Sequence, residues 1–328
     1  MTTHFRFTAP AAALALCLSA SFTLAADVKW DMPMAYPATN YHSENATQFA
    51  KEVTEASGGK LEIVTHPGGS LFKGDEIFRA VRTGQAPIGE RLISALGNED
   101  PIFELDSLPF LVTNFAESRK LYDTTRPMVE KVLADKGLTL LYTVPWPPQG
   151  LYTKSEVNSV ADMKGVKFRA YNAATSRLAE LMGAVPTKIE AAELTQAFAT
   201  GAVDSMISSG STGYDSKLWE HTKYWYNIQA WMPKNMVIVN TEAFNGLDEA
   251  TRNVVLEKAK AAEDRGWAKA EELANWYVEE LAKNGMTVGP AGDQLKKDFM
   301  AIGETMTTEW LAKAGDAGKA AIDAYKAQ

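Results

Sequence analysis

The pattern that most constrains the fold is an alternation of strand-like and helix-like segments that runs along the chain, stops midway and starts again. Residues 27–33 alternate like a strand, and residues 44–57 have the spacing of an amphipathic helix. The alternation restarts with a strand at 166–171 and a helix at 172–182, followed later by a long helix over 248–283. Strands that alternate with helices predict an α/β fold with mostly parallel sheets.

Two α/β units that the chain connects twice, with a long helix behind them, predict a clamshell of two lobes. We expect residues 27–150 and 236–275 to form lobe I and residues 151–235 and 276–328 to form lobe II, with the long helix spanning both lobes. In such a fold the strand ends of both lobes converge on one cleft. A ligand is therefore expected between the lobes.

The N-terminal segment, residues 1–26, has the features of a secretory signal peptide. A weakly basic start is followed by an apolar run and then by small residues, which predicts cleavage after Ala25 or Ala26. The only cysteine, Cys17, lies in this segment, so the mature chain is expected to contain no disulfide. We therefore expect a periplasmic protein whose fold is held by its core alone.

Composition and residue spacing argue against several classes of partner and cofactor. The net charge of −8 disfavours nucleic acid and anionic lipid as partners. No later stretch has the ~20 uninterrupted apolar residues that span a bilayer, so the protein is not expected to be membrane-embedded. The spacing between the histidines His42, His66 and His221 is not that of metal ligands. We therefore expect no metal site and no cofactor. The glycine-rich segment 68–76 is no phosphate loop, because Asp75 stands where a lysine is required.

The acidic segment 98–106 contains the carboxylates that a glycosidase-like hydrolase would need. The plainer interpretation, which we favour, is a solvated loop between two elements. No other group of side chains indicates catalysis, so the chain is predicted not to be an enzyme.

Arg169 is the sharpest candidate for a binding residue, because it ends a strand that should reach the cleft. A guanidinium stays charged at ordinary pH, so it must lie in water or meet an anion, and a structural salt bridge is an equally good interpretation. Trp146 and Trp231 also lie near strand ends, although buried tryptophan is more often core. Gln149 and Asn235 either fix polar ligand atoms or cap turns.

The segment 163–205 resembles the solute-binding proteins of tripartite ATP-independent periplasmic (TRAP) transporters. The family pattern has Lys-Gly, an apolar residue, Lys, an apolar residue and Arg, then a helix, a turn with Pro, a Glu-led helix and Thr-Gly-x-Val-Asp. Segments 49–89, 105–111 and 236–240 are also similar, so the resemblance covers nearly the whole mature chain. The matching residues are Lys164, Gly165, Lys167, Arg169, Gly183, Pro186, Glu193, Gly201, Val203 and Asp204.

The resemblance implies a type II periplasmic binding-protein clamshell that closes on an organic acid. It also implies delivery of that acid to the membrane permease subunits of the transporter. In the family, the arginine that matches Arg169 pairs with the ligand carboxylate. A planar guanidinium binds a carboxylate through two parallel hydrogen bonds, which fits that role.

The sequence departs from the family pattern at two places. Many relatives carry a second arginine where the nearest alignment puts Gly150, and many have Gln-Glu-Asn-Pro where this chain has residues 205–210. A pocket with one cation and several aromatic faces favours an aromatic or ring-containing monocarboxylate, such as a hydroxybenzoate, a mandelate-like acid or an indole acid. Sugar acids and dicarboxylates rank behind. Two further classes of protein fit the sequence less well, namely the binding protein of an ATP-driven importer and a secreted hydrolase.

The predicted binding set joins the arginine to aromatic and polar side chains near the expected cleft. Glu90 either accepts a hydrogen bond from a ligand hydroxyl or pairs with Arg91 or another cation. The full predicted set is Arg169, Trp146, Gln149, Tyr171, Ser208, Trp231, Asn235, Glu90 and Asn40.

Overall fold

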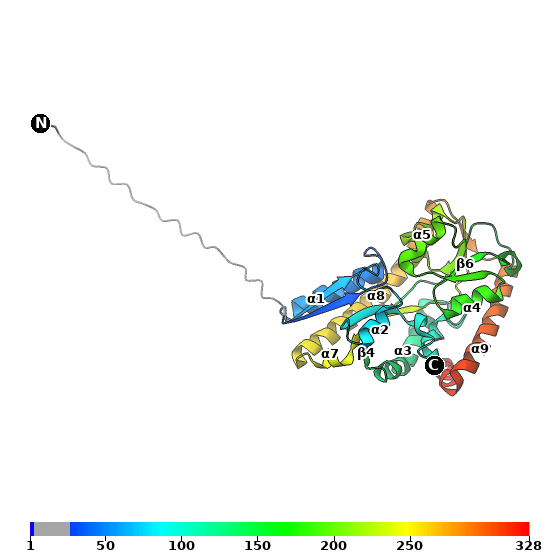
Figure 1. The fold of residues 1–328 in the computed structure, drawn as a ribbon. Helices are drawn as coiled ribbons and strands as arrows, with labels where there is room; N and C mark the ends of the chain where they lie inside the picture. Colours follow the sequence, from blue (N-terminus) through cyan, green and yellow to red (C-terminus); the bar gives the residue numbers. More distant parts are fainter. Residues whose placement is uncertain (3–26, 328) are drawn as a thin grey trace.

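The chain folds into two lobes, each built on its own sheets with helices packed around them (Figure 1). The computed structural model describes residues 1–2 and 27–327. The predicted signal peptide therefore lies, apart from its first two residues, outside the described part of the chain. The α/β class and the two-lobed clamshell predicted from the sequence are confirmed.

Lobe I contains a parallel pair of strands, β1 and β2, and a three-stranded antiparallel sheet in the order β3-β10-β4. The middle strand of the larger sheet, β10, follows the second lobe in sequence and returns to the first. The strands are β1 (Val28–Pro33), β2 (Leu61–His66), β3 (Ile88–Leu92), β4 (Leu138–Pro145) and β10 (Lys234–Asn240). The helices are α1 (Tyr41–Ala56), α2 (Ile77–Arg82), α3 (Phe115–Ala134) and α7 (Thr241–Asn245), with the 3₁₀ helices η1 (Ile93–Leu96) and η2 (Pro101–Ser107).

Lobe II is built on one six-stranded sheet in the order β11-β9-β5-β8-β6-β7. Its strands are β5 (Gly150–Thr153), β6 (Lys167–Ala170), β7 (Val185–Lys188), β8 (Ser205–Ser208), β9 (Tyr224–Asn227) and β11 (Thr287–Pro290). Its helices are α4 (Ala173–Leu181), α5 (Leu194–Ala199) and α6 (Gly210–Asp215), with the 3₁₀ helices η3 (Val160–Met163), η4 (Ala191–Glu193) and η5 (Leu218–Glu220).

The sheets are mixed, so the prediction of mostly parallel sheets is wrong. Within the described chain, four strand pairs are parallel and four are antiparallel. The antiparallel pairs all involve β5 or β10, the two strands that follow the crossings between the lobes. A strand that arrives from the other lobe without a helical crossover can pair antiparallel with its neighbours.

Two long helices, α8 (Glu249–Lys283) and α9 (Asp293–Lys326), connect the lobes. Val255 of α8 packs in the core of lobe I, and Leu281, near its other end, packs in the core of lobe II. α9 begins on lobe II and runs along the edge of the molecule until Ile322 joins the core of lobe I (Figure 1). The expected helix spanning both lobes is therefore present, and α9 is a second one.

The acidic segment 98–106 is not the solvated loop predicted from its composition. It contains η2, and the side chains of Glu104 and Asp106 are buried. Glu104 Oε2 lies 2.9 Å from Lys313 Nζ, and Asp106 Oδ2 lies 3.5 Å from Lys234 Nζ. These cations come from α9 and β10, more than a hundred residues away, so local sequence gives no sign that the carboxylates will be buried and paired.

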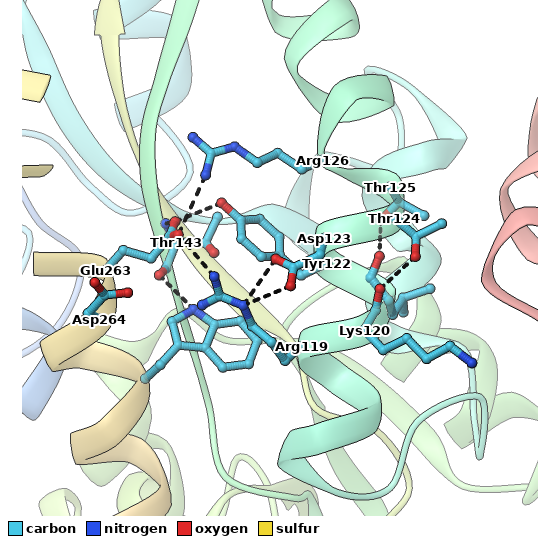
Figure 2. Close-up of polar contacts among 12 residues, drawn as sticks. Arg119, Lys120, Tyr122, Asp123, Thr124, Thr125, Arg126, Thr143, Glu263 and Asp264 are labelled. Carbon is cyan, nitrogen blue, oxygen red and sulfur yellow. Dashed lines mark hydrogen bonds and ion pairs between the residues drawn. The ribbon is translucent and has the colours of Figure 1, made fainter. Parts of the chain in front are cut away.

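A buried carboxylate, Glu263 of α8, ties this helix to α3 and β4 (Figure 2). The hydroxyl of Tyr122 donates to Glu263 Oε2 at 2.7 Å, and the backbone N–H of Thr143 donates to the same oxygen at 3.2 Å. The guanidinium groups of Arg126 and Arg119 lie 3.5 and 3.7 Å from Glu263 Oε1. The carboxylate is thus fully engaged by partners from two other elements of lobe I.

Candidate functional site

A cavity lies between the lobes, where strand ends from both lobes converge. Lobe I contributes side chains that follow β1, lie on β3 or end β4, and lobe II contributes side chains from β6, β8 and the segment after β7. The charged and aromatic residues of this lining are Tyr36, Arg91, Trp146, Arg169, Tyr171 and Glu190. The cleft expected from the sequence is therefore present.

Arg169 borders the cavity as a buried cation without an acidic partner. Its Nε donates to the carbonyl of Ile189 at 3.0 Å, and its guanidinium carbon lies 5.0 Å from the centroid of the Tyr171 ring. Within residues 27–327, no carboxylate lies within 4.0 Å of this guanidinium, so the structural salt bridge left open by the sequence is not formed there. Burial lowers the pKa of Arg169, because a guanidinium away from water loses its hydration. Such a site favours an anionic ligand.

Arg91 supplies a second guanidinium, so the prediction of a cavity with one cation is wrong. Arg91 lies on β3 with only 4% of its surface exposed, and its Nη1 is 3.3 Å from Glu190 Oε2. Neighbouring residues of a strand point to opposite faces, so Glu90 turns away from the cavity when Arg91 turns toward it. All five residues of β3 are buried, so both faces of the strand pack against other parts of the protein. The sequence of β3 therefore does not indicate which face points to the cavity.

Aromatic rings form the apolar part of the cavity wall. The ring centroids of Tyr36 and Trp146 are 4.7 Å apart, and Tyr171 borders the cavity from lobe II. The indole N–H of Trp146 donates to Asn235 Oδ1 at 2.8 Å, which fixes the orientation of the ring. Flat apolar faces beside a cation suit a ligand that has both a ring and an anionic group.

Five of the nine predicted binding residues border the cavity: Arg169, Trp146, Gln149, Tyr171 and Ser208. Gln149 Nε2 donates to the carbonyl of Pro147 at 2.9 Å, and the hydroxyl of Tyr171 lies 3.4 Å from Gln149 Oε1. These contacts hold both side chains at the crossing between β4 and β5. Thr212 at the start of α6 also borders the cavity, and its position gave no sequence signal.

The other four predicted residues lie outside the cavity lining. Trp231 is fully buried in the core of lobe II and donates to the Tyr171 hydroxyl at 2.9 Å. Asn235 Nδ2 donates to Glu90 Oε1 at 3.2 Å, so both residues stand behind Trp146. Asn40 caps α1 and donates to Asp215 Oδ2 at 2.6 Å across the cleft. Trp231 and Asn235 thus each hold a wall residue in place, whereas Glu90 holds Asn235. Asn40 joins the lobes.

Gly150 occupies a position that has no room for a side chain. A Cβ atom there would lie 2.4 Å from the ring of Trp225, which packs against the backbone of β5. The arginine that many relatives were expected to have at this position would therefore clash. The second cation of this cavity comes from Arg91 instead.

Replacing Glu90 with glutamine is expected to weaken the pH dependence of stability. Burial raises the pKa of Glu90 to about 7, and the hydrogen bond from Asn235 opposes that shift only in part. An unfolded glutamate ionises near pH 4.3, so between these values the folded state holds the additional proton and the free energy of unfolding falls as pH rises. Glu90→Gln removes this linkage, on the order of 2 kcal/mol between pH 5 and 8. Urea unfolding of the wild type and of Glu90→Gln at these two pH values measures the difference in stability. Equal pH dependence of stability in both proteins would contradict the prediction.

The described residues hold neither a metal cluster nor a membrane-spanning helix. Residues 1–2 and 27–327 contain no group of three or more His, Cys, Asp or Glu side chains arranged to hold a metal ion. In the same part of the chain, no helix combines the length and apolarity that crossing a bilayer requires.

Comparisons with known proteins agree with this fold. The model of bacterial extracellular solute-binding protein, family 7, matches residues 33–314. DctP6, an extracytoplasmic solute receptor of Bordetella pertussis that binds pyroglutamic acid, is 50% identical with a TM-score of 0.90, over 92% of this chain and 100% of that chain. A TRAP solute-binding protein from a marine metagenome, specific for pyroglutamate, is 52% identical with a TM-score of 0.90, over 92% of this chain and 99% of that one.

The comparison with curated proteins gives the same family at lower identity. The ectoine/5-hydroxyectoine-binding periplasmic protein UehA of Ruegeria pomeroyi is 24% identical over 334 residues, which cover 98% of this chain and 96% of UehA. The chain therefore belongs to bacterial extracellular solute-binding protein family 7, the solute-binding proteins of TRAP transporters.

Proposed function

We propose that this protein is the periplasmic receptor for pyroglutamate or a closely similar ring monocarboxylate. The observation that carries the proposal is Arg169, a buried guanidinium that borders the cavity without a carboxylate partner in the described chain. The ligand carboxylate would supply the missing anion through two parallel hydrogen bonds. The Trp146 and Tyr36 rings would pack against the ring of the ligand.

The identity of the ligand is supported by relatives that share about half of this sequence. Three solved relatives, 50, 52 and 47% identical, bind pyroglutamate. Pyroglutamate is a five-membered lactam with one carboxylate, so it belongs to the ring-containing monocarboxylates favoured by the sequence. Relatives with bound gulonate or glucuronate are 18 and 20% identical to this chain. At such low sequence identity they indicate a shared fold and not a shared ligand.

We propose that ligand binding closes the two lobes and that the closed form delivers the ligand to the membrane permease, without catalysis. The proposed lobes are 27–150 with 236–275 and 151–235 with 276–328. The first two residues of β10 and the end of α9 pack with lobe I, although these bounds assign them to lobe II. Side chains that meet across the cleft would hold the closed form. Asn172 Nδ2 donates to Ser94 Oγ at 3.0 Å, and Arg91 pairs with Glu190. Hinge motion at the strand crossings is the usual form of such closure.

A thermal-shift panel on protein stripped of ligand by unfolding and refolding tests the proposal. L-Pyroglutamate should raise the melting temperature in proportion to the logarithm of its concentration, because it binds only the folded state. Benzoate, glucuronate and succinate serve as an aromatic acid, a sugar acid and a dicarboxylate. Stabilisation by one of these acids, with none by pyroglutamate, would refute the proposed ligand.

Trp146→Ala is expected to weaken binding of pyroglutamate more than binding of propionate, a small acid without a ring. The substitution removes an aromatic face and the apolar area buried against it, about 1.5–3 kcal/mol or roughly 10- to 100-fold in the dissociation constant. Trp276→Ala is the matched control, because Trp276 is exposed on α8 and does not border the cavity. Equal losses for both acids would mean that Trp146 only supports the fold.

A further inference from the structure

The Arg91–Glu190 ion pair spans the cleft and borders the cavity, which is an unusual place for a carboxylate in an anion receptor. Arg91 belongs to β3 of lobe I, and Glu190 follows β7 of lobe II. The charged side chains that border the cavity are Arg91, Arg169 and Glu190, so their charges sum to about +1. A carboxylate beside a bound anion repels it unless the ligand offers that carboxylate a hydrogen-bond donor.

We propose that Glu190 is a specificity-determining residue whose carboxylate accepts a hydrogen bond from a ring N–H of the ligand, while Arg91 neutralises its charge. This inference rests on the proposed function and extends it. It assigns the lactam N–H, rather than the ring alone, as the feature that the protein selects. Glu190 thereby separates lactam acids from other ring acids of the same size and charge.

Chain connectivity places Glu190 beside the carboxylate anchor. The carbonyl of Ile189 accepts the hydrogen bond from Arg169 Nε at 3.0 Å, and Glu190 is the next residue. A ligand whose carboxylate meets the Arg169 guanidinium therefore has its neighbouring atoms close to Glu190. In pyroglutamate the N–H is bonded to the carbon that carries the carboxylate, so donor and anion leave the ring side by side.

Both members of the ion pair have hydrogen-bonding capacity that the described protein does not use. Glu190 Oε1 is buried and accepts no hydrogen bond from residues 27–327; Lys188 Nζ, at 3.4 Å, supplies charge without hydrogen-bond geometry. Arg91 Nε is also buried and without an acceptor in the described chain. A buried polar group left unpaired is destabilising. A lactam offers a donor N–H and an acceptor oxygen on the two sides of one carbonyl carbon, which complements one unused acceptor, Glu190 Oε1, and one unused donor, Arg91 Nε.

The glycine-rich segment 68–76, which is no phosphate loop, packs directly over this ion pair. A Cβ atom at Gly74 would lie 2.6 Å from Glu190 Oε2 and 2.9 Å from Arg91 Nη1. A side chain at this position would displace the carboxylate of Glu190 or the guanidinium of Arg91 from their present contact. The segment therefore covers part of the pair, although the Glu190 side chain stays 20% exposed and also borders the groove on the outer side. A partly covered pair acts in a less polar medium than water, where a mismatched ligand binds less favourably.

The proposal predicts weak binding of two kinds of ligand, namely dicarboxylates and ring acids without an N–H group. A dicarboxylate brings two negative charges to a site with a net charge of about +1, so one of them stays uncompensated. The lactone analogue 5-oxotetrahydrofuran-2-carboxylate keeps the ring, carbonyl and carboxylate of pyroglutamate but replaces the N–H with an oxygen atom. This oxygen would face Glu190 with lone pairs instead of a proton. A hydrogen bond to a charged group contributes about 1.5–3 kcal/mol, so the lactone should bind at least about tenfold more weakly.

Calorimetric titration of both ligands into the wild type and Glu190→Gln tests the proposal. The wild type should prefer the lactam over the lactone by at least about tenfold, and Glu190→Gln should reduce this ratio by about tenfold, because its amide can donate to the lactone oxygen. Glu193→Gln is the matched control, since Glu193 is exposed and, unlike Glu190, does not border the cavity, so its replacement should leave the ratio unchanged. Thermal unfolding verifies that each variant is folded.

The ratio distinguishes selection from a merely structural contact. The inference is overturned if Glu190→Gln weakens binding of the lactam and the lactone equally, or if the wild type binds the two within about threefold of each other. In either case Glu190 does not recognise the ring N–H, although the proposed receptor function stands. If pyroglutamate does not bind the wild type at all, the proposed function and the inference fall together.

Discussion

Replacing Arg169 with alanine is expected to weaken binding of pyroglutamate by at least about 30-fold while the protein stays folded. Truncating one partner of a desolvated charge pair costs about 2–5 kcal/mol, and each 1.4 kcal/mol is tenfold in the dissociation constant. The free protein loses only one hydrogen bond, from Arg169 Nε to the carbonyl of Ile189, and no ion pair of the described chain. Stability without ligand should therefore change little or rise, because a buried charge is removed.

Arg177→Ala is the control for this substitution. Arg177 belongs to α4, the helix that follows the strand of Arg169, and pairs with Glu180 and Glu309 at the surface. Replacing Arg177 should leave the affinity for pyroglutamate unchanged.

Arg169→Lys should lose most of the affinity too, because an ammonium cannot form the two parallel hydrogen bonds of a guanidinium. Calorimetry that gives Arg169→Ala the affinity of the wild type would show that Arg169 does not anchor the carboxylate.

Replacing Glu263 with alanine is expected to lower the free energy of unfolding by about 2–4 kcal/mol without altering the cavity. The carboxylate accepts hydrogen bonds from the Tyr122 hydroxyl and the Thr143 backbone N–H, and both donors are buried (Figure 2). Without Glu263 these donors lose their acceptor, at about 1–3 kcal/mol for each group that stays unpaired. Arg119 and Arg126 are about one third exposed and can return to water, so they add little.

Urea unfolding of Glu263→Ala and Glu257→Ala measures this effect against a matched change. Glu257 lies on the same helix, is exposed, and pairs only with its neighbour Lys258 in the described chain. Its replacement should change the midpoint little, whereas Glu263→Ala should lower it clearly. Equal midpoints for the two variants would show that the network of Figure 2 adds nothing to stability.

The sequence predicted the architecture because the hydrophobic periodicities of this chain agree with its tertiary structure. The strand at 166–171 and the helix at 172–182 lie within about a residue or two of β6 and α4. The family resemblance, carried by the segment around Arg169, is confirmed by the match over residues 33–314. Sheet direction was not predictable in this way, because the pairing of β10 between β3 and β4 depends on a return from lobe II.

The site was predictable only where a residue type and a strand end coincide. Arg169 and Trp146 both stand at strand ends, and both border the cavity. Arg91 was missed because β3 is buried on both faces, so its sequence pattern does not distinguish the side of Glu90 from the side of Arg91. Glu190 was missed because its partner lies 99 residues earlier in the chain, in the other lobe. Contacts between the lobes depend on how the two lobes pack against each other, which local sequence does not encode.

A calorimetric titration of L-pyroglutamate into the ligand-stripped wild-type protein decides whether this chain is a receptor for that acid. We expect saturable binding of one ligand per chain, with a negative heat-capacity change from the apolar area buried against Trp146 and Tyr36. Absence of binding at millimolar pyroglutamate, together with saturable binding of succinate or glucuronate, would contradict the proposed function.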